Sequence, residues 1–597
     1  MSTIDFVIVA VYLITIVGVG LVLQRKASQG IDSYFLGNRN LPWWALGASG
    51  MASNTDIAGT MINTAFIYAL GTKGFFIEIR GGVTLIMAFL MIFMGKWNRR
   101  AKVMTLAEWM HLRFGKGKEG DLARIIMSIA MIIMTIAMVT YFVIGAGKFV
   151  GEFLGIHPRL ASILMIVLAM IYTVASGLYG VVWTDVFQGT LIFGTIIYIC
   201  IMAMRLVNLP TEFLVSVPLK EGGFQTIQTT LAEWTRILPP IEMNMPAEST
   251  YSIYNLFGIA IMFYLFKVTL EGSGGTGGYM IQRYFAAKSD REAGLLSLFW
   301  TFLLSFRWPL IASFAMLGIY YGIHNQVIAD PELVLPTVIG AYIPSGIKGL
   351  LVAGLMAAAM STFDSTVNAG AAYWVKDLYQ TYINPKASEK QLMAHSRVAS
   401  IVIVLLALLV SYTVRNINDI WGWITMGIGS GLLIPQLLRW YWWRFNGYGF
   451  AIGVGAGMTA AILTRAFGPA DLPEYVSFVI GSGSSLLGCI LGTYFTAPTE
   501  HTILDNFYRI TRPFGFWGHV RRSLPKDILQ SIHRENRRDI FSTFLAVPWQ
   551  VILFLTGMMI VMGRWQNMGW LTVALVVLSI GLYFSWFRHL SKEVKVD

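Results

Sequence analysis

The sequence predicts an all-α protein that crosses a membrane many times. Hydrophobic residues make up 56% of the 597 residues and charged residues only 13%, whereas a typical soluble domain has about 25% charged residues. Apolar runs recur along the whole chain, and those of about 20 residues can each cross about 30 Å of hydrocarbon as a helix. The alternating segments of about 10 residues that a membrane β-barrel requires are missing from the sequence. We therefore expect residues 1–597 to form a single membrane domain.

The apolar runs define fifteen candidate spans. They are residues 4–23, 42–69, 76–95, 123–150, 159–177, 181–206, 251–283, 293–323, 346–375, 396–414, 418–440, 448–467, 474–495, 543–563 and 568–588. The first run has no basic segment before it and no cleavage signal after it, which predicts a retained helix.

The loops predict an orientation. Lysine and arginine are concentrated in loops 96–122 and 496–542, whereas loop 207–250 holds two basic residues and five glutamates. The positive-inside rule then places the N-terminus outside, the C-terminus in the cytoplasm, and a short cytoplasmic loop at 178–180. The net charge of +12 is therefore explained by basic residues in cytoplasmic loops and not by nucleic-acid binding. We expect the protein in a cell membrane, most simply a bacterial inner membrane. Loop 496–542 is expected to be a solvated, partly amphipathic hairpin that contacts anionic headgroups.

Sequence motifs favour neither an enzyme nor a disulfide scaffold. Cys200 and Cys489 both fall inside apolar runs and have no metal-ligand spacing. The hydrolase, metalloprotease and phosphate-binding motifs Gly-x-Ser-x-Gly, His-Glu-x-x-His and Gly-Lys-Ser/Thr are missing. We expect no enzymatic activity.

Polar residues interrupt four of the apolar runs. A charge at the bilayer centre costs at least about 2.5 to 3.5 kcal/mol, so each such charge needs a partner, a cavity or a function. The four stretches are 53–56, with Ser-Asn-Thr-Asp in a row; 181–188, which contains Asp185; the glycine-rich 267–278; and 357–368, which contains Asp364.

The stretch 357–368 places oxygen atoms at one-turn spacing. On a helix Ser361, Asp364, Ser365 and Asn368 share one face. Hydroxyl groups alone are typical of contacts between packed helices, but the carboxylate of Asp364 argues against that interpretation. Carboxylate, hydroxyl and carbonyl oxygens together suit an alkali cation and not zinc or copper.

Two spans are predicted to be broken. The glycines of residues 272–278 should unwind the seventh span, and Gly47, Gly50 and Gly59 weaken the second. Broken helices five spans apart are typical of an inverted five-helix repeat, in which freed backbone groups hold ions and solutes near the membrane centre. The alternative is that these glycines only permit close helix packing.

Several blocks of sequence carry a family resemblance. They are Asp32-Ser-Tyr-Phe-Leu-Gly with Leu41-Pro-Trp-Trp-Ala-Leu-Gly-Ala-Ser, Thr105-Leu-Ala-Glu-Trp, Gly180-Val-Val-Trp-Thr-Asp-Val-Phe-Gln, Ile281-Gln-Arg-Tyr-Phe-Ala-Ala-Lys, and Ala357-Ala-Ala-Met-Ser-Thr through Lys376-Asp-Leu-Tyr. In this order they resemble the sodium:solute symporter family, which includes sodium/galactose, sodium/sialic acid and sodium/proline transporters. The resemblance covers about residues 1 to 440.

The resemblance implies a LeuT-type core. Its two inverted repeats would be residues 42–206 and 251–440, with an extra helix at 4–23 before them and additional helices in 448–588. The main Na⁺ site of the family corresponds here to the carbonyls of Ala52, Thr55 and Ala358 and the hydroxyls of Ser361 and Thr362. A second Na⁺ site, present in some members, resembles Asp185, Asp364 and Ser365 with Ser361. Asp364 departs from those members, which have serine there.

The expected solute pocket departs from the sugar branch of the family. The aromatic gate of that branch is replaced here by residues 273–278, and Asp56 fits neither the sugar nor the proline pattern. The pocket candidates are Asn54, Asp56, Glu78, Arg80, Lys267, Glu271 and Arg307. For each of them the alternative is an internal ion pair or an interfacial side chain.

The function implied by the resemblance is Na⁺-coupled import of a small polar organic solute by alternating access. The expected partners are the solute, sodium ions and the lipid bilayer, with no nucleic acid and no obligate protein partner. Whether the solute is a sugar or polyol, or an amino acid or carboxylate, stays open. A cation-sensing membrane protein without transport is a further alternative.

Overall fold

The computed structural model describes residues 1–27, 39, 41–275, 278–414, 416–469 and 472–590. The block at residues 32–37 lies outside the described residues. Helices dominate the described part of the chain, and nine helical stretches in it are long and apolar enough to cross a membrane. The prediction of an all-α polytopic protein is confirmed, whereas the number of fifteen spans stays a prediction.

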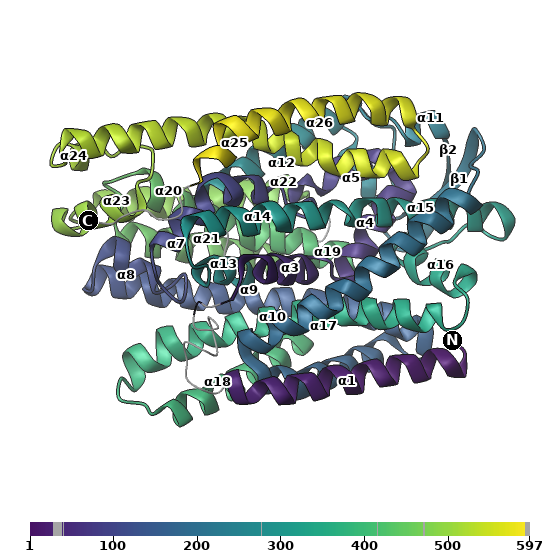
Figure 1. Cartoon of the computed structure of the whole chain (residues 1–597), viewed down its shortest axis with the longest axis horizontal. Coiled ribbons are helices and arrows are strands. Elements are labelled where there is room, and N and C mark those ends of the chain that lie inside the picture. Colours follow the sequence, from purple (N-terminus) through teal and green to yellow (C-terminus); the bar gives the residue numbers. More distant parts are fainter. Residues whose placement is uncertain (28–38, 40, 276–277, 415, 470–471, 591–597) are drawn as a thin grey trace.

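The connecting segments gather at two opposite ends of the molecule. Figure 1 shows α8 (Trp109–Phe114), α23 (His501–Thr511) and α24 (Gly518–Arg521) at the end marked C. The other end carries the strands β1 (Glu212–Pro218) and β2 (Phe224–Thr230) and the helix α16 (Val334–Tyr342). The loops expected inside the cell and those expected outside it thus lie at opposite ends of the molecule. Which of these ends faces the cytoplasm stays a prediction.

The first half of the chain forms a series of helices. They are α1 (Thr3–Ala27), α3 (Trp43–Asn54), α4 (Ile57–Leu70), α5 (Thr72–Ile77), η2 (Glu78–Arg80), α6 (Ile86–Phe89), the π-helix η3 (Leu90–Met94), α7 (Gly95–Arg100), α8, α9 (Lys118–Leu154) and α10 (Pro158–Leu206).

The predicted break in the second span is confirmed. α3 ends at Asn54, and the Thr55 amide donates to the carbonyls of Met51 and Ala52. Asp56 then begins α4, because its Oδ1 accepts a hydrogen bond of 2.5 Å from the Gly59 amide. A side-chain cap of this kind replaces the backbone partner that a helix start lacks. The polar residues that interrupt the apolar run therefore end one helix and start the next.

The observed helices depart from the predicted spans at two places. The span 76–95 is not continuous, since residues 81–85 separate η2 from α6 and Thr84 has a φ of 54°; the glycines at 81 and 82 favour such a departure. The expected loop 178–180 is helical, because α10 runs through it as one element of 49 residues. No proline follows Pro158 in this helix, and isolated glycines are tolerated inside helices.

A β-hairpin that was not predicted lies between the two halves. β1 pairs antiparallel with β2, with Glu212 opposite Thr230 and Pro218 opposite Phe224. Gly222 and Gly223 in its turn have φ values of +96° and +83°, which glycine adopts without strain. The alternation of buried Phe213, Val215 and Val217 before this turn is the signal that could have predicted it. The short helices α11 (Leu231–Trp234) and η4 (Thr250–Tyr254) follow.

The second half repeats the pattern of a broken helix followed by long helices. Its elements are α12 (Phe257–Gly274), α13 (Gly278–Phe285), α14 (Asp290–Ser305), α15 (Arg307–His324), η5 (Pro331–Leu333), α16, α17 (Ile347–Ala372), the π-helix η6 (Tyr373–Ile383), α18 (Glu389–Ser411), α19 (Ile417–Gly422), the π-helix η7 (Trp423–Ile428) and α20 (Gly429–Tyr441). The predicted unwinding is confirmed at Gly275, which follows α12 with a φ of +86°.

The last helices flank this core. They are α21 (Gly447–Phe467), α22 (Glu474–Tyr494), α23, α24, α25 (Lys526–Val561), α26 (Trp565–Ser585) and η8 (Phe587–His589). Loop 496–542 is largely helical, because it contains α23, α24 and the beginning of α25. α25 and α26 pack against each other along one flank of the molecule (Figure 1).

Candidate ion and solute site

The end of α3 packs against α17 through buried oxygen atoms. The Thr362 hydroxyl donates to the Ser53 carbonyl at 2.7 Å and to the Ala358 carbonyl at 3.0 Å. The hydroxyls of Ser53 and Ser361 are 3.3 Å apart. Hard oxygens from both helices therefore converge where α3 ends.

The five residues predicted for the main Na⁺ site all lie at this junction or next to it. Ala358, Ser361 and Thr362 are on the face of α17 that meets α3. Ala52 and Thr55 form the end of α3 on either side of Ser53, and all five are buried. The residues are thus brought together, while their role as ligands stays a prediction.

The residues predicted for a second Na⁺ site surround the guanidinium of Arg283. Arg283 Nη2 donates to the hydroxyls of Ser53 at 2.8 Å and Ser365 at 3.2 Å, and lies 3.5 Å from Asp185 Oδ2. The Ser49 hydroxyl accepts from Arg283 Nη2 at 2.7 Å and donates to Asp185 Oδ2 at 2.5 Å. A fixed cation therefore already contacts Asp185 and Ser365.

Asp364 lies beside this cluster on α17. Its side chain is buried, and both Asp364 and Asp185 lie near the Tyr12 hydroxyl of α1. Two carboxylates and one guanidinium thus share the region between α1, α10, α13 and α17.

The importance of Arg283 was not predicted from the sequence. It ends the predicted span 251–283, where an arginine is ordinarily taken as an interfacial anchor. In the structure its side chain is fully buried and contacts α3, α10 and α17. The sequence contains a signal for this pairing. An arginine in an apolar span requires an acidic partner, and Asp185 is the acidic residue of another polar stretch within the spans.

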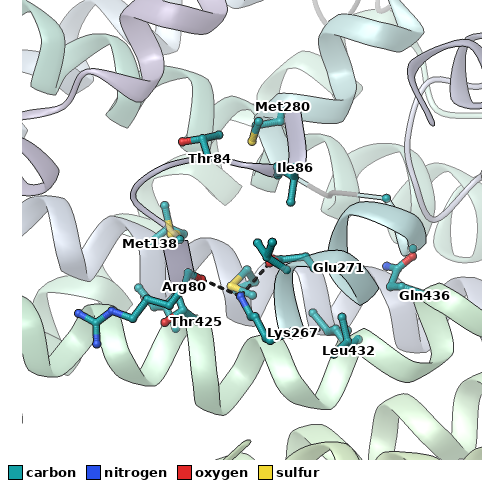
Figure 2. Close-up of a pocket in the computed structure, with 18 of the residues that line it drawn as sticks. Arg80, Thr84, Ile86, Met138, Lys267, Glu271, Met280, Thr425, Leu432 and Gln436 are labelled. Atoms are coloured by element: carbon teal, nitrogen blue, oxygen red, sulfur yellow. Dashed lines mark hydrogen bonds and ion pairs between the residues drawn. The ribbon is translucent and has the colours of Figure 1, made fainter. Parts of the chain in front are cut away.

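A cavity of about 220 Å³ lies between the two broken helices. Asn54 at the end of α3 and Gly274 and Gly275 at the end of α12 all line it. Lys267 lies at its edge, where its ammonium donates to Glu271 Oε2 at 2.8 Å and to the Arg80 carbonyl at 2.9 Å. Figure 2 shows this arrangement, with the Arg80 guanidinium directed away from the Lys267–Glu271 pair.

A smaller cavity of about 40 Å³ continues the first. The residues that line both cavities are Asn54, Gly81, Thr84, Met138 and Trp421. Asp56 and Arg307 line the smaller one, and Asp56 faces both Arg307 and the Tyr141 hydroxyl. Gly59 makes this convergence possible, because a Cβ there would lie 2.5 Å from Arg307 Nη2 and 2.9 Å from the Tyr141 hydroxyl oxygen.

The charged groups around the two cavities are arranged in pairs. Arg80 is fully buried, contacts Glu474, and donates to Glu78 Oε1 at 3.1 Å and Asn418 Oδ1 at 2.6 Å. Lys267 pairs with Glu271, and Arg307 faces Asp56. All seven predicted pocket residues line at least one of the two cavities. The charged ones among them also face opposite charges, so both the pocket prediction and its alternative, internal ion pairs, apply to them.

Several buried polar atoms around the cavities have no hydrogen-bond partner in the described part of the chain. They are both amide atoms of Asn63, Glu78 Oε2, Arg307 Nε, Thr366 Oγ1, Trp421 Nε1 and Gln436 Oε1. Buried polar groups in proteins are ordinarily hydrogen-bonded, so such a group of donors and acceptors indicates a polar ligand or water. Trp421, which is not among the predicted pocket residues, adds an aromatic ring that packs on Tyr141 with centroids 5.1 Å apart.

Comparison with known proteins places the chain in a family. The model of the "Sodium:solute symporter family" matches residues 34–457. The sodium/glucose cotransporter of Vibrio parahaemolyticus is 29% identical over 503 residues, which are 79% of this chain and 87% of the relative. The sodium/sialic acid symporter SiaT of Proteus mirabilis is 24% identical over 526 residues, which are 84% of this chain and 97% of the relative.

A solved structure confirms the predicted LeuT-type fold class. A Na⁺-coupled sialic acid symporter in a substrate-bound outward-open state has a TM-score of 0.63 to this chain at 22% identity, over 84% of this chain and 99% of that structure. The family match covers well over half of the chain and the fold agrees with it. The chain therefore belongs to the sodium:solute symporter family and is a Na⁺-coupled solute symporter of the membrane.

Proposed function

We propose that this symporter couples one Na⁺, bound where α3 ends against α17, to the import of a small neutral solute rich in hydroxyl groups. The observation that carries the ion site is the contact of the Thr362 hydroxyl with the Ser53 and Ala358 carbonyls across the two helices. In this proposal the Ala52, Thr55 and Ala358 carbonyls and the Ser361 and Thr362 hydroxyls are the ligands. Oxygen donors without a thiolate or imidazole suit an alkali cation.

A single ion is proposed because the second predicted site contains its own cation. Arg283 donates to Ser365 and lies beside Asp185, two of the three residues expected to hold a second Na⁺. A guanidinium and a sodium ion at the same oxygens would repel each other strongly in a buried site. Asp364 then balances the local charge instead of ligating an ion.

The nature of the solute is inferred from the charges and the unpartnered atoms around the two cavities. The charged side chains there already face opposite charges, so an ionic solute would have to break existing pairs. Hydroxyl groups both donate and accept, which suits the unpartnered Asn63, Gln436 and Trp421 atoms. The name of one relative, a sodium/glucose cotransporter, agrees with this solute class, whereas the name of another, a sodium/sialic acid symporter, does not.

Coupling follows if both ligands favour the same conformation. Na⁺ entering from outside would connect the end of α3 to α17 and stabilise an arrangement in which Asn54 lines the solute cavity. A solute in that cavity would in turn stabilise the ion site, because linkage is reciprocal. Movement of α3 away from α17 towards the cytoplasm would then release both.

Uptake of radiolabelled solutes into proteoliposomes tests this proposal. A panel of hexoses, myo-inositol, sialic acid and proline would be supplied under an inward Na⁺ gradient and under an equal K⁺ gradient. We expect a hexose or polyol to accumulate in Na⁺ only. Accumulation of sialic acid or proline without a sugar or polyol would contradict the solute class, and uptake indifferent to Na⁺ would contradict the ion site.

A further inference from the structure

A third cavity, of about 670 Å³, lies away from the solute site at the end of the molecule that carries the basic loops. Residues from η3, α7, α14, α25 and α26 line it, and none of them lines the two solute cavities. Six of the lining residues are lysine or arginine, and four are aspartate or glutamate. The cavity therefore has an excess of positive charge.

Three of the four acidic groups are already neutralised inside the protein. Lys96 contacts Glu535 at 2.8 Å and Asp539 at 2.7 Å. Arg100 contacts Asp290 and Glu535, both at 2.7 Å. Arg512 lies 3.9 Å from the second oxygen of Glu535. This network connects α7, the start of α14 and α25, and it leaves Asp527 as the fourth acidic group.

Three arginines around the same cavity have no such partner. In the described part of the chain, Arg291, Arg534 and Arg538 form no ion pair within 4.0 Å and no side-chain hydrogen bond, although all three line the cavity. Guanidinium groups recognise phosphate oxygens through two parallel hydrogen bonds. Three of them from α14 and α25 around one space are suited to a phosphate group.

Apolar surface adjoins the charged part of the cavity. Met91, Ile92, Trp586 and Leu590 contribute to its lining. Beyond them the outer faces of α25 and α26 expose large side chains, namely Phe541, Phe544 and Phe584, as expected of helices that face lipid. A ligand with a phosphate group and acyl chains would contact both parts, whereas free phosphate would contact only the arginines.

We propose that this cavity binds the phosphate of an anionic glycerophospholipid through Arg291, Arg534 and Arg538. Basic pockets at the cytoplasmic ends of membrane helices bind such headgroups. The bound lipid would connect α14, a helix of the transport core that packs on α3, to the flanking α25. This proposal does not depend on the identity of the transported solute.

Lipid retention by the purified protein tests the proposal directly. The protein would be reconstituted in nanodiscs of phosphatidylcholine with phosphatidylglycerol, extracted into detergent, and examined by native mass spectrometry. The triple variant Arg291→Gln/Arg534→Gln/Arg538→Gln would be compared with the control Arg509→Gln/Arg522→Gln/Arg537→Gln. The control removes the same charge from three exposed arginines of the same region that do not line the cavity.

We expect the wild-type protein and the control to retain phosphatidylglycerol, and the triple variant to bind it about tenfold or more weakly, since charged hydrogen bonds are lost. Equal retention by the triple variant, or equal retention of phosphatidylcholine by the wild type, would overturn the site. Loss of the bound lipid on adding inorganic phosphate at the same phosphate concentration would show that a free anion is the ligand and would overturn the lipid assignment. If the triple variant does not fold, the single Arg534→Gln change at an exposed position is expected to weaken retention about threefold, and unchanged retention would count against the site.

Discussion

At the scale of single residues, hydroxyl groups on α17 carry the proposed ion site. Thr362 and Ser361 are buried and their oxygens meet the end of α3. Replacing both by alanine removes two proposed ligands but little volume. We expect the half-saturating Na⁺ concentration for uptake to rise about tenfold or more, because each lost oxygen forms a hydrogen bond or ion contact worth about 1 kcal/mol or more. Na⁺ titration of solute uptake in proteoliposomes measures this effect.

Ser400→Ala is a matched control for that double variant. Ser400 is also buried, and its hydroxyl donates to the carbonyl one turn earlier, at Ser396, with a distance of 3.0 Å. It lies on α18, away from the end of α3. The control should keep the wild-type Na⁺ dependence, and an unchanged half-saturation in the double variant would reject Ser361 and Thr362 as ligands.

The partnership of Arg283 with Asp185 predicts a coupled effect on stability. Arg283→Gln leaves a buried carboxylate without its cation, and removal of one partner of a buried pair costs about 3 to 5 kcal/mol. In the double variant with Asp185→Asn neither charge remains, so we expect part of that loss to be recovered. Thermal unfolding of the four proteins in detergent provides the comparison. Additive losses in the double variant would show that the two groups do not depend on each other.

At the scale of elements, the two broken helices position the site, and the sequence predicted both. Polar side chains and glycines in apolar runs are strong local signals, because they compete with the helix for backbone hydrogen bonds. The pairing of Arg283 with Asp185 was not predictable in the same way, since it depends on which helices pack together. The β-hairpin and the continuous α10 were not predicted either. The hairpin lies in a polar connecting segment outside the apolar runs, and a single Gly180 does not end a helix.

The break between α12 and α13 is predicted to be required for a normal rate of transport. Gly275 has a φ of +86° and lines the larger of the two proposed solute cavities. Gly275 also has a ψ of 160°, a backbone conformation that is almost restricted to glycine, so in Gly275→Ala the Cβ strains it by about 1 to 3 kcal/mol and would lie 2.9 Å from Met94 Cε. We expect slower solute uptake, measured as the initial rate in proteoliposomes. Gly455→Ala on α21, where a Cβ meets nothing within 4 Å, should keep the wild-type rate, and equal rates in both variants would contradict a role for this break.

At the scale of the whole molecule, the charged residues form two separate groups, one around the proposed solute cavities and one at the end with the basic loops. Around the solute cavities each charged side chain faces an opposite charge, while at the end with the basic loops Arg291, Arg534 and Arg538 line a cavity with positive excess. The first arrangement suits a neutral solute and the second an anionic membrane surface. The sequence alone predicted the basic loops. The ion pairs around the cavities could not be predicted in this way, because they form only when α4, η2, α12 and α15 pack together.

One Na⁺ and a neutral solute together predict that each transport cycle moves one positive charge. An inside-negative potential of about 100 mV then adds about 2.3 kcal/mol to accumulation, equivalent to about a 50-fold higher ratio of internal to external solute at equilibrium. Uptake into proteoliposomes with an imposed K⁺ diffusion potential measures this dependence, with vesicles at zero potential as the control. An anionic solute with one Na⁺ would make uptake insensitive to the potential. Two charges per solute would contradict coupling to a single Na⁺.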